Sequence, residues 1–157
     1  MIDGSIASRL ALGLAALLMG LFTHTVVVAD SGQDVEKLLR EIRQDHPLPA
    51  LAFLRQTTSI NADRASYQGR YQGIEVSVET HPNSTRVASI LLAIEGADQI
   101  RAILPAVVRV LGPPQTSDRR QGIYGWSGPG YRTASVHKAP SGDSGGNGTT
   151  IVSIFYR

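Results

Sequence analysis

One short string in the sequence, Gly142–Gly146 (GDSGG), has the residue types of a nucleophilic serine site. Glycines around such a serine let backbone amides form an oxyanion hole, while a nearby histidine activates the hydroxyl. Among residues 30–157, the histidines that could be the partner of Ser144 are His46, His81 and His137. The string therefore raises a small hydrolase as one interpretation, to be weighed against a loop made of turn-forming residues.

The context of Ser144 favours the loop. The string resembles the nucleophile motif of chymotrypsin-type serine proteases, but those enzymes need two β-barrels and much more chain beyond the serine than residues 145–157. The three histidines lie in DHP, THP and VHK, which are not the settings of a protease histidine. A second string, Gly125–Pro129 (GWSGP), approaches the nucleophile elbow of hydrolases, but a strand and not the required helix is expected after it.

Other reactive centres have no signal in the sequence. The chain has no cysteine, and His46, His81 and His137 are too far apart in sequence for metal-ligand spacing on one helix. Glu75 and Glu79 lie four residues apart along an expected strand, too distant to act as a catalytic pair. No catalytic residue, cofactor or metal site is predicted, and the chain is not expected to be an enzyme. A net charge of +2 from scattered basic residues argues against nucleic acid as a partner.

The N-terminal residues have the pattern of an export signal. Arg9 precedes an apolar run over residues 10–22, and Ala29 suits cleavage by a signal peptidase. We therefore predict a signal segment over 1–29 and a periplasmic or secreted protein. A retained anchor, which would be the chain's only contact with a membrane, and a buried helix are the alternatives. Residues 30–157 are predicted to form a single cysteine-free domain with a flexible loop at 141–148.

Hydrophobic periodicity predicts an α+β fold. Apolar residues recur at helical spacing over 35–42 and over 98–111, where Pro105 is expected to cause a kink or a break. A short helix is expected over 49–54, and strands over 74–78, 86–95, 122–126, 131–138 and 149–156. The prediction is an antiparallel sheet of about five strands, covered on one face by two main helices. The two halves are alike, so a tandem helix-hairpin repeat is a hypothesis, with chance patterning as its alternative.

The second half carries a resemblance to known proteins. A helix, the stop at Leu111–Pro114 and a strand bearing Trp126 resemble the small lipoprotein of the outer-membrane β-barrel assembly machinery. The pattern is also similar to the β-lactamase inhibitory protein fold. The resemblance covers residues 97–157 and, loosely, the first half. It implies only the architecture, which is that of a domain presenting a sheet face to another protein. It does not imply any particular binding residue.

Aromatic and arginine residues are the candidates for partner binding, because both types anchor protein interfaces. The alternative for Trp126 is a place in the core. The predicted function is an exported, non-enzymatic protein-binding domain: an inhibitor, an immunity-type protein or an envelope accessory protein. Its partner would be another envelope or secreted protein. The alternatives are a small hydrolase and a carrier of a small apolar ligand between helices and sheet, with tyrosines at the pocket mouth. The candidate partner-binding residues are Tyr67, Arg70, Tyr71, Trp126, Tyr131 and Arg132, and the candidate mouth residues are Tyr67, Tyr71 and Tyr131.

Overall fold

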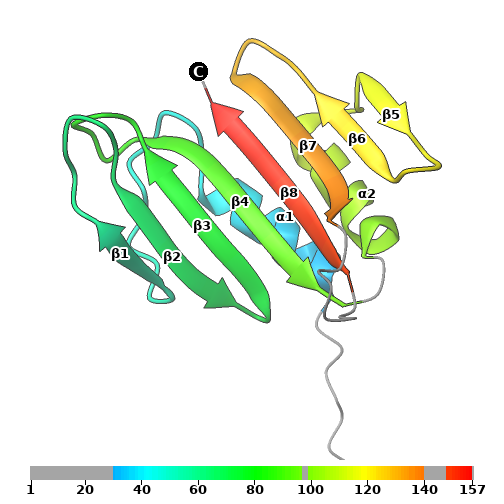
Figure 1. Cartoon of the computed structure of the whole chain (residues 1–157), viewed down its shortest axis with the longest axis horizontal. Helices are drawn as coiled ribbons and strands as arrows, with labels where there is room; N and C mark the ends of the chain where they lie inside the picture. Colours follow the sequence, from blue (N-terminus) through cyan, green and yellow to red (C-terminus); the bar gives the residue numbers. More distant parts are fainter. Residues whose placement is uncertain (1–29, 97–98, 140–147, 157) are drawn as a thin grey trace, which may run out of the picture.

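A computed structural model describes residues 30–96, 99–139 and 148–156 of the chain. The predicted signal segment, Ser144 and most of the predicted loop at 141–148 lie outside these residues. The described residues form two helices and eight strands, arranged along the chain in two similar runs of one helix followed by four strands (Figure 1). In chain order they are α1 (Ser31–Glu41), β1 (Leu54–Thr58), β2 (Ser66–Tyr71), β3 (Ile74–Thr80), β4 (Val87–Glu95), α2 (Ile100–Leu111), β5 (Thr116–Asp118), β6 (Ile123–Trp126), β7 (Tyr131–Ala139) and β8 (Thr149–Tyr156).

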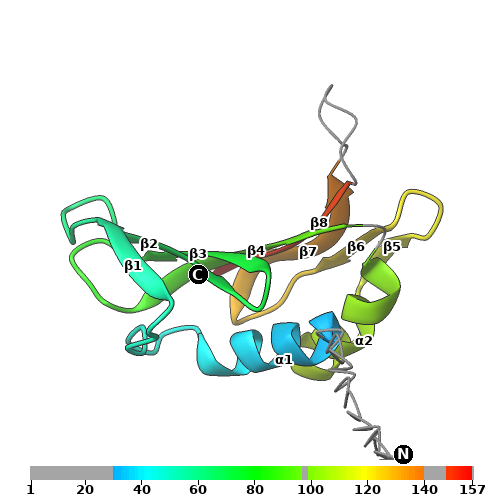
Figure 2. The same ribbon diagram turned by 90° about the horizontal axis from the view of Figure 1, so that it is seen from below.

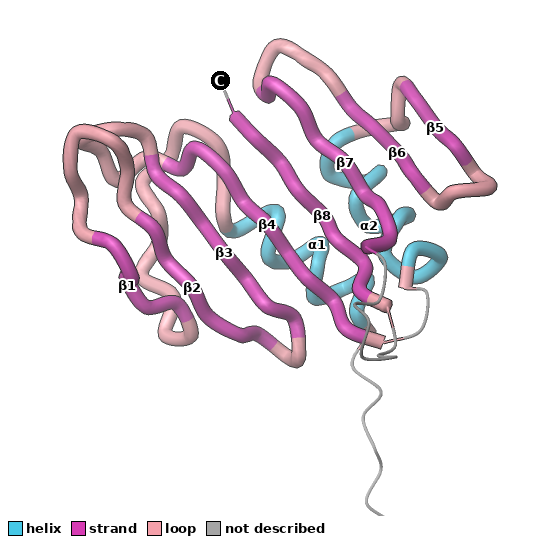
Figure 3. The backbone as a smooth tube through the Cα atoms, viewed as in Figure 1, coloured by secondary structure: helices cyan, strands magenta, loops and turns pink. Residues whose placement is uncertain are grey.

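All eight strands belong to one antiparallel sheet, in the order β1-β2-β3-β4-β8-β7-β6-β5 (Figure 3). Each run is a helix followed by a four-stranded meander, and the two meanders join where β4 pairs with β8. The prediction of about five strands is therefore wrong. The molecule is dominated by its sheet, and each helix is followed by four strands and not by a hairpin.

The strands that the sequence did not predict are β1, β2 and β5. Their residues are mostly polar and half-buried or exposed, so they lack the alternation of apolar and polar residues that marked the other five. The short helix expected over 49–54 does not form. The amide of Leu54 instead donates to the carbonyl oxygen of Leu51 in a turn (2.9 Å), and β1 begins there.

Local chemistry favours the start of α1 and the end of α2. The Asp30 carboxylate caps α1 by accepting hydrogen bonds from the amides of Gly32 (3.1 Å) and Gln33 (3.4 Å). Helix α2 continues through Pro105 without the expected break and ends at Leu111. The residue that follows, Gly112, has a φ of +82°, which favours glycine.

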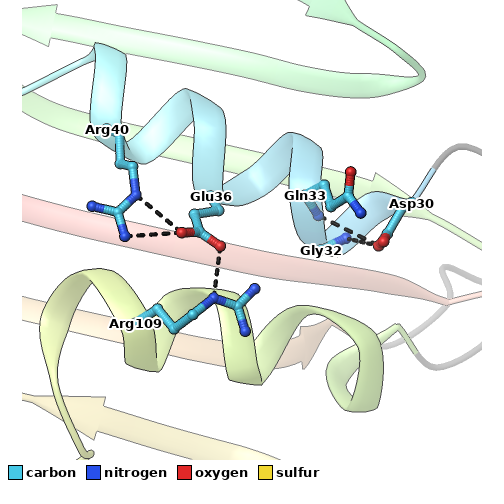
Figure 4. Close-up of polar contacts among 6 residues, drawn as sticks. All are labelled: Asp30, Gly32, Gln33, Glu36, Arg40 and Arg109. Carbon is cyan, nitrogen blue, oxygen red and sulfur yellow. Dashed lines mark hydrogen bonds and ion pairs between the residues drawn. The ribbon is translucent and has the colours of Figure 1, made fainter.

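The two helices lie side by side on one face of the sheet (Figure 2). Gly32 permits this approach, because a Cβ atom there would lie 2.6 Å from the carbonyl oxygen of Ala102 on α2. Glu36 links the helices by accepting hydrogen bonds from Arg40 on its own helix and from Arg109 on α2 (Figure 4). The outer surface of the helix layer is thus tied together by one carboxylate.

The core lies between the helices and the sheet. Each buried Leu, Ile or Val side chain in it stabilises the fold by about 1.5–3 kcal/mol relative to an exposed one. No helix in the described part of the chain has the length and apolarity needed to cross a membrane. The largest fully buried side chains include Leu38 and Ile42 from the first helix region, Ile74, Val76 and Val78 from β3, Ile90 and Leu92 from β4, Ile103 and Val107 from α2, and Ile154 from β8.

Candidate protein-binding face

The other face of the sheet has no helix over it among the described residues (Figure 2). Strand alternation decides which side chains it carries. On β8, Thr150, Val152 and Ile154 are buried toward the helices, so the residues between them point the opposite way. The register carries this assignment across the neighbouring strands. We call this surface the open face; its central side chains are Leu91 and Ala93 on β4, Ile151, Ser153 and Phe155 on β8, Thr133, Ser135 and His137 on β7, and Ile123 on β6.

Apolar side chains are concentrated on the open face. Among the described residues, four large hydrophobic side chains are exposed, and three of them lie here: Leu91 (38% exposed), Ile123 (43%) and Phe155 (45%). The fourth, Ile60, lies in the loop after β1. Leu91 is paired with Ser153, and Phe155 with Ser89, so the two apolar side chains lie on adjacent strands. A grouping of exposed apolar residues on one face is typical of an interaction surface.

Charged residues on the open face lie toward its β2 and β3 side. Arg70 on β2 forms an ion pair with Glu95 (3.5 Å), and Arg64 pairs with Glu79 (3.3 Å), which also accepts a hydrogen bond from Ser89 (3.4 Å). These charges largely neutralise one another. The face therefore has an apolar and hydroxyl-rich centre with a charged margin, which is the usual anatomy of a protein interface.

A chain of hydrogen bonds crosses the centre of the open face. The Ser135 hydroxyl lies 3.2 Å from Nδ1 of His137 and 3.0 Å from the Ser153 hydroxyl. A serine beside a histidine is the first requirement for a nucleophile, but the histidine must also be oriented by a third group. The carboxylate of Glu95, on β4, is two strands away at about 4.8 Å per strand and is paired with Arg70. The three side chains thus supply hydroxyl and imidazole groups for binding, without the described residues completing a triad.

The predicted partner-binding residues do not lie together. Trp126 is 3% exposed and packs in the core, where a partner cannot reach it. Tyr67 pairs with the buried Val78, which places the tyrosine on the helix side of the sheet. Tyr131 also packs against the core.

The remaining three predicted residues are divided between the two sides of the sheet. Tyr71 is on the helix side, where its ring lies 5.1 Å from that of Phe53 and its hydroxyl accepts a 2.8 Å hydrogen bond from Lys37. Arg70 is on the open face, at its charged margin. Arg132 is exposed at a bulge of β7. The structure therefore does not form one aromatic and arginine-rich face from these six residues.

The residues that form the open face were only partly visible in the sequence. Leu91 and Ala93 alternate along β4 with the core-facing Ile90, Leu92 and Ile94, which is a local signal. The proximity of Phe155, Ser135 and His137 to Leu91 and Ala93 depends on β8 lying between β4 and β7. An available signal was the apolar Ile151 and Phe155 at positions of β8 that alternate with its core residues.

An apolar hollow of about 410 Å³ lies at the β1 edge of the sheet, on its helix side. Of the three tyrosines expected at the mouth of a ligand pocket, only Tyr67 lines it. Its other lining residues are mainly those of the segment 48–52 with Leu54, Gln56 and Thr85. The expected mouth of three tyrosines is therefore not formed by this hollow.

The three described histidines belong to different parts of the fold. His46 follows α1, and its Nδ1 lies 2.8 Å from the carbonyl oxygen of Gln44. His81 follows β3, and His137 lies on β7. The described residues contain no group of three side chains able to hold a metal ion.

Comparison with known proteins adds no family to this geometry. No protein-family model matches the chain, and no curated protein or solved structure shows significant similarity to it.

Proposed function

We propose that this chain is an exported, non-enzymatic protein-binding domain whose open face docks onto an apolar surface of another protein. An inhibitor, an immunity-type protein and an envelope accessory protein all fit this proposal. The observation that carries it is the placement of Leu91, Ile123 and Phe155 on the one sheet face that no described helix covers.

The construction of the sheet supports such a role. Buried side chains from both helices pack against the helix side of the central strands and fix the sheet in place. The open face is therefore largely formed before a partner binds. A preformed surface loses little conformational entropy on binding. The Ser135–His137–Ser153 chain adds donors and acceptors beside the apolar residues, which gives the face directional contacts as well as apolar area.

A photo-crosslinking amino acid placed at Phe155 tests the proposal in an envelope extract, with the same amino acid at the exposed Arg43 beyond α1 as control. The partner captured at Phe155, but not at Arg43, is then purified and titrated with variants. Leu91→Ser and Phe155→Ser are expected to weaken binding by roughly tenfold or more, because central apolar contacts dominate interface energies.

Ile60→Ser is the matched control, since Ile60 is 43% exposed but lies in the loop after β1 and not on the central strands of the open face. It should leave the affinity unchanged. Equal affinities for all three variants would contradict the proposal, provided that circular dichroism shows each of them folded.

A further inference from the structure

The outer edge of β1 is a second surface with binding chemistry. Hydrogen-bonded and non-hydrogen-bonded pairs alternate along an antiparallel pair of strands. The amide of Leu54 donates to Leu51 and not to β2, so Leu54 and Gln56 have their main-chain groups directed away from β2. The carbonyl of Leu54 and the amide and carbonyl of Gln56 therefore face the free edge of the sheet.

The apolar hollow lies beside these main-chain groups. The side chains of Leu54 and Gln56 line it together with Tyr67, which is the register partner of Gln56. A strand added at this edge would place the side chains opposite Leu54 and Gln56 on the same side of the sheet as the hollow. These two positions of an added strand would accordingly hold apolar side chains.

Arg55 influences which residue type fits between these two positions of an added strand. It is exposed and lies on the side of the sheet opposite to the hollow, and it forms no ion pair with a described carboxylate. A residue opposite Arg55 in an added strand would be its direct cross-strand neighbour, where an acidic side chain is favoured and a basic one is disfavoured.

From these three features we infer that the β1 edge binds an extended segment of a partner polypeptide by strand addition, and that the segment reads apolar, acidic, apolar. Main-chain hydrogen bonds to Leu54 and Gln56 hold its backbone, the hollow takes the two apolar side chains, and Arg55 pairs with the acid. This mode of recognition uses the sheet edge for affinity and alternate side chains for specificity. The site lies at the β1 edge, with its hollow on the opposite side of the sheet from the open face, and it does not depend on the proposed function.

The probe is a short peptide with a central Val-Glu-Val sequence, flanked by threonines and with both termini chemically blocked. Calorimetry measures its binding to the protein, and NMR of the protein amides locates the binding site. Binding is expected, with protection of the Gln56 amide from hydrogen exchange. Methylating the peptide amide nitrogen of either valine should abolish binding, because these amides face the β1 edge. The same modification at the glutamate should be tolerated, because its amide points to solvent.

Variants of Gln56 separate the main-chain contact from the side-chain contact. Gln56→Pro removes an amide that β2 does not use and should weaken binding by about fivefold to tenfold, the equivalent of one lost hydrogen bond. Gln56→Ala keeps the amide and is the matched control, since it also removes the contact of the Gln56 side chain with the Thr58 carbonyl. Its affinity should fall less than that of Gln56→Pro, because it loses only a side chain that lines the hollow and keeps the main-chain contact.

A charge exchange tests the role of Arg55. Arg55→Glu should weaken binding of the Val-Glu-Val peptide and should improve binding of a Val-Lys-Val peptide. The open-face variants Leu91→Ser and Phe155→Ser should bind the Val-Glu-Val peptide normally, which separates this test from that of the proposed function.

Three outcomes would overturn the inference. One is the absence of binding by the unmodified Val-Glu-Val peptide. Another is binding that neither amide methylation nor Gln56→Pro affects. The third is self-association of the chain that Gln56→Pro abolishes, because the edge would then serve a second copy of the same protein.

Discussion

The indole nitrogen of Trp126 donates a 2.8 Å hydrogen bond to the carbonyl oxygen of Gly112. Gly112 follows the last residue of α2, and Trp126 is the last residue of β6. The contact joins the end of a helix to an outer strand of the sheet. It also gives the tryptophan a structural role in the core, which explains why its polar group is not presented to a partner.

Trp126→Phe should destabilise the fold by about 1–3 kcal/mol, because it removes this hydrogen bond and part of the buried ring. Urea unfolding followed by circular dichroism measures the loss. Phe155→Leu, a substitution of an exposed aromatic residue, is the control and should change the free energy of unfolding by no more than about 0.5 kcal/mol. Equal unfolding midpoints for both variants would show that the Trp126 contact contributes nothing.

Glu36 should give the protein an acid-sensitive component of stability. Its hydrogen bond with Arg109, and then that with Arg40, lower the pKa of the Glu36 carboxyl from 4.5. A lowered pKa in the folded state means that the stabilisation is present above the unfolded pKa and is lost as the pH falls through the folded value. Glu36→Gln should therefore lower the melting temperature at neutral pH and have progressively less effect below pH 4.5.

Two arginine variants show which hydrogen bond of Glu36 is responsible for the acid-sensitive stability. Arg109→Gln removes the link between helices, at 2.7 Å, whereas Arg40→Gln removes a contact within α1. Both should reduce the acid dependence, with the larger reduction for Arg109→Gln, because its hydrogen bond is the greater influence on the carboxyl. A melting temperature of Glu36→Gln that follows that of the unchanged protein at every pH would contradict the prediction.

Tyr156 should ionise later than an ordinary tyrosine. Burial raises the pKa of its hydroxyl from 10.0 to about 12, because a phenolate is poorly solvated there. A raised pKa of an acid means that its contribution to stability is complete below pH 10 and is lost as the pH rises toward 12. Absorbance titration should show a late component that is missing in Tyr156→Phe, and this variant should also resist alkaline unfolding better. A complete tyrosine titration near pH 10 would contradict this prediction.

Gly69→Ala should detach or distort the β1 edge. A Cβ atom at Gly69 would fall on the carbonyl oxygen of Phe53, which is main chain and cannot rotate away. We expect a loss of at least about 2 kcal/mol and faster hydrogen exchange of the amides of β1. Gly73→Ala is the control: it has open space but a φ of +84°, so it should cost only about 1 kcal/mol. A smaller effect at Gly69 than at Gly73 would mean that β1 adapts freely.

The sequence was sufficient for the elements that carry a strong apolar period. The stripe of Val35, Leu38 and Leu39 predicted a helix, and the alternation from Ile74 to Val78 predicted a strand. It was insufficient where a strand is polar or short, as with the Leu54–Thr58 strand, since such strands are stabilised by pairing that a local pattern does not record.

The candidate site depended even more on long-range pairing. Leu91 and Ser153 become neighbours because strands far apart in sequence lie side by side, and no local signal gives that register. For the tyrosines, the sequence indicated a binding role that the register does not support. Tyr67 was selected by residue type, but its pairing with Val78 directs the ring toward the helices. Residue type indicated which side chains could bind, and only the register determined where they point.

The place of β8 has a consequence for how the molecule is assembled. It is synthesised after every strand it joins, yet it lies in the middle of the sheet between β4 and β7. Without β8, β4 and β7 would each be edge strands with unpaired main-chain amides and carbonyls. Completing the sheet requires contacts between parts of the chain that are distant in sequence, and such contacts form slowly. The pairing of β8 with both neighbours therefore joins the two halves of the sheet and also completes the centre of the open face.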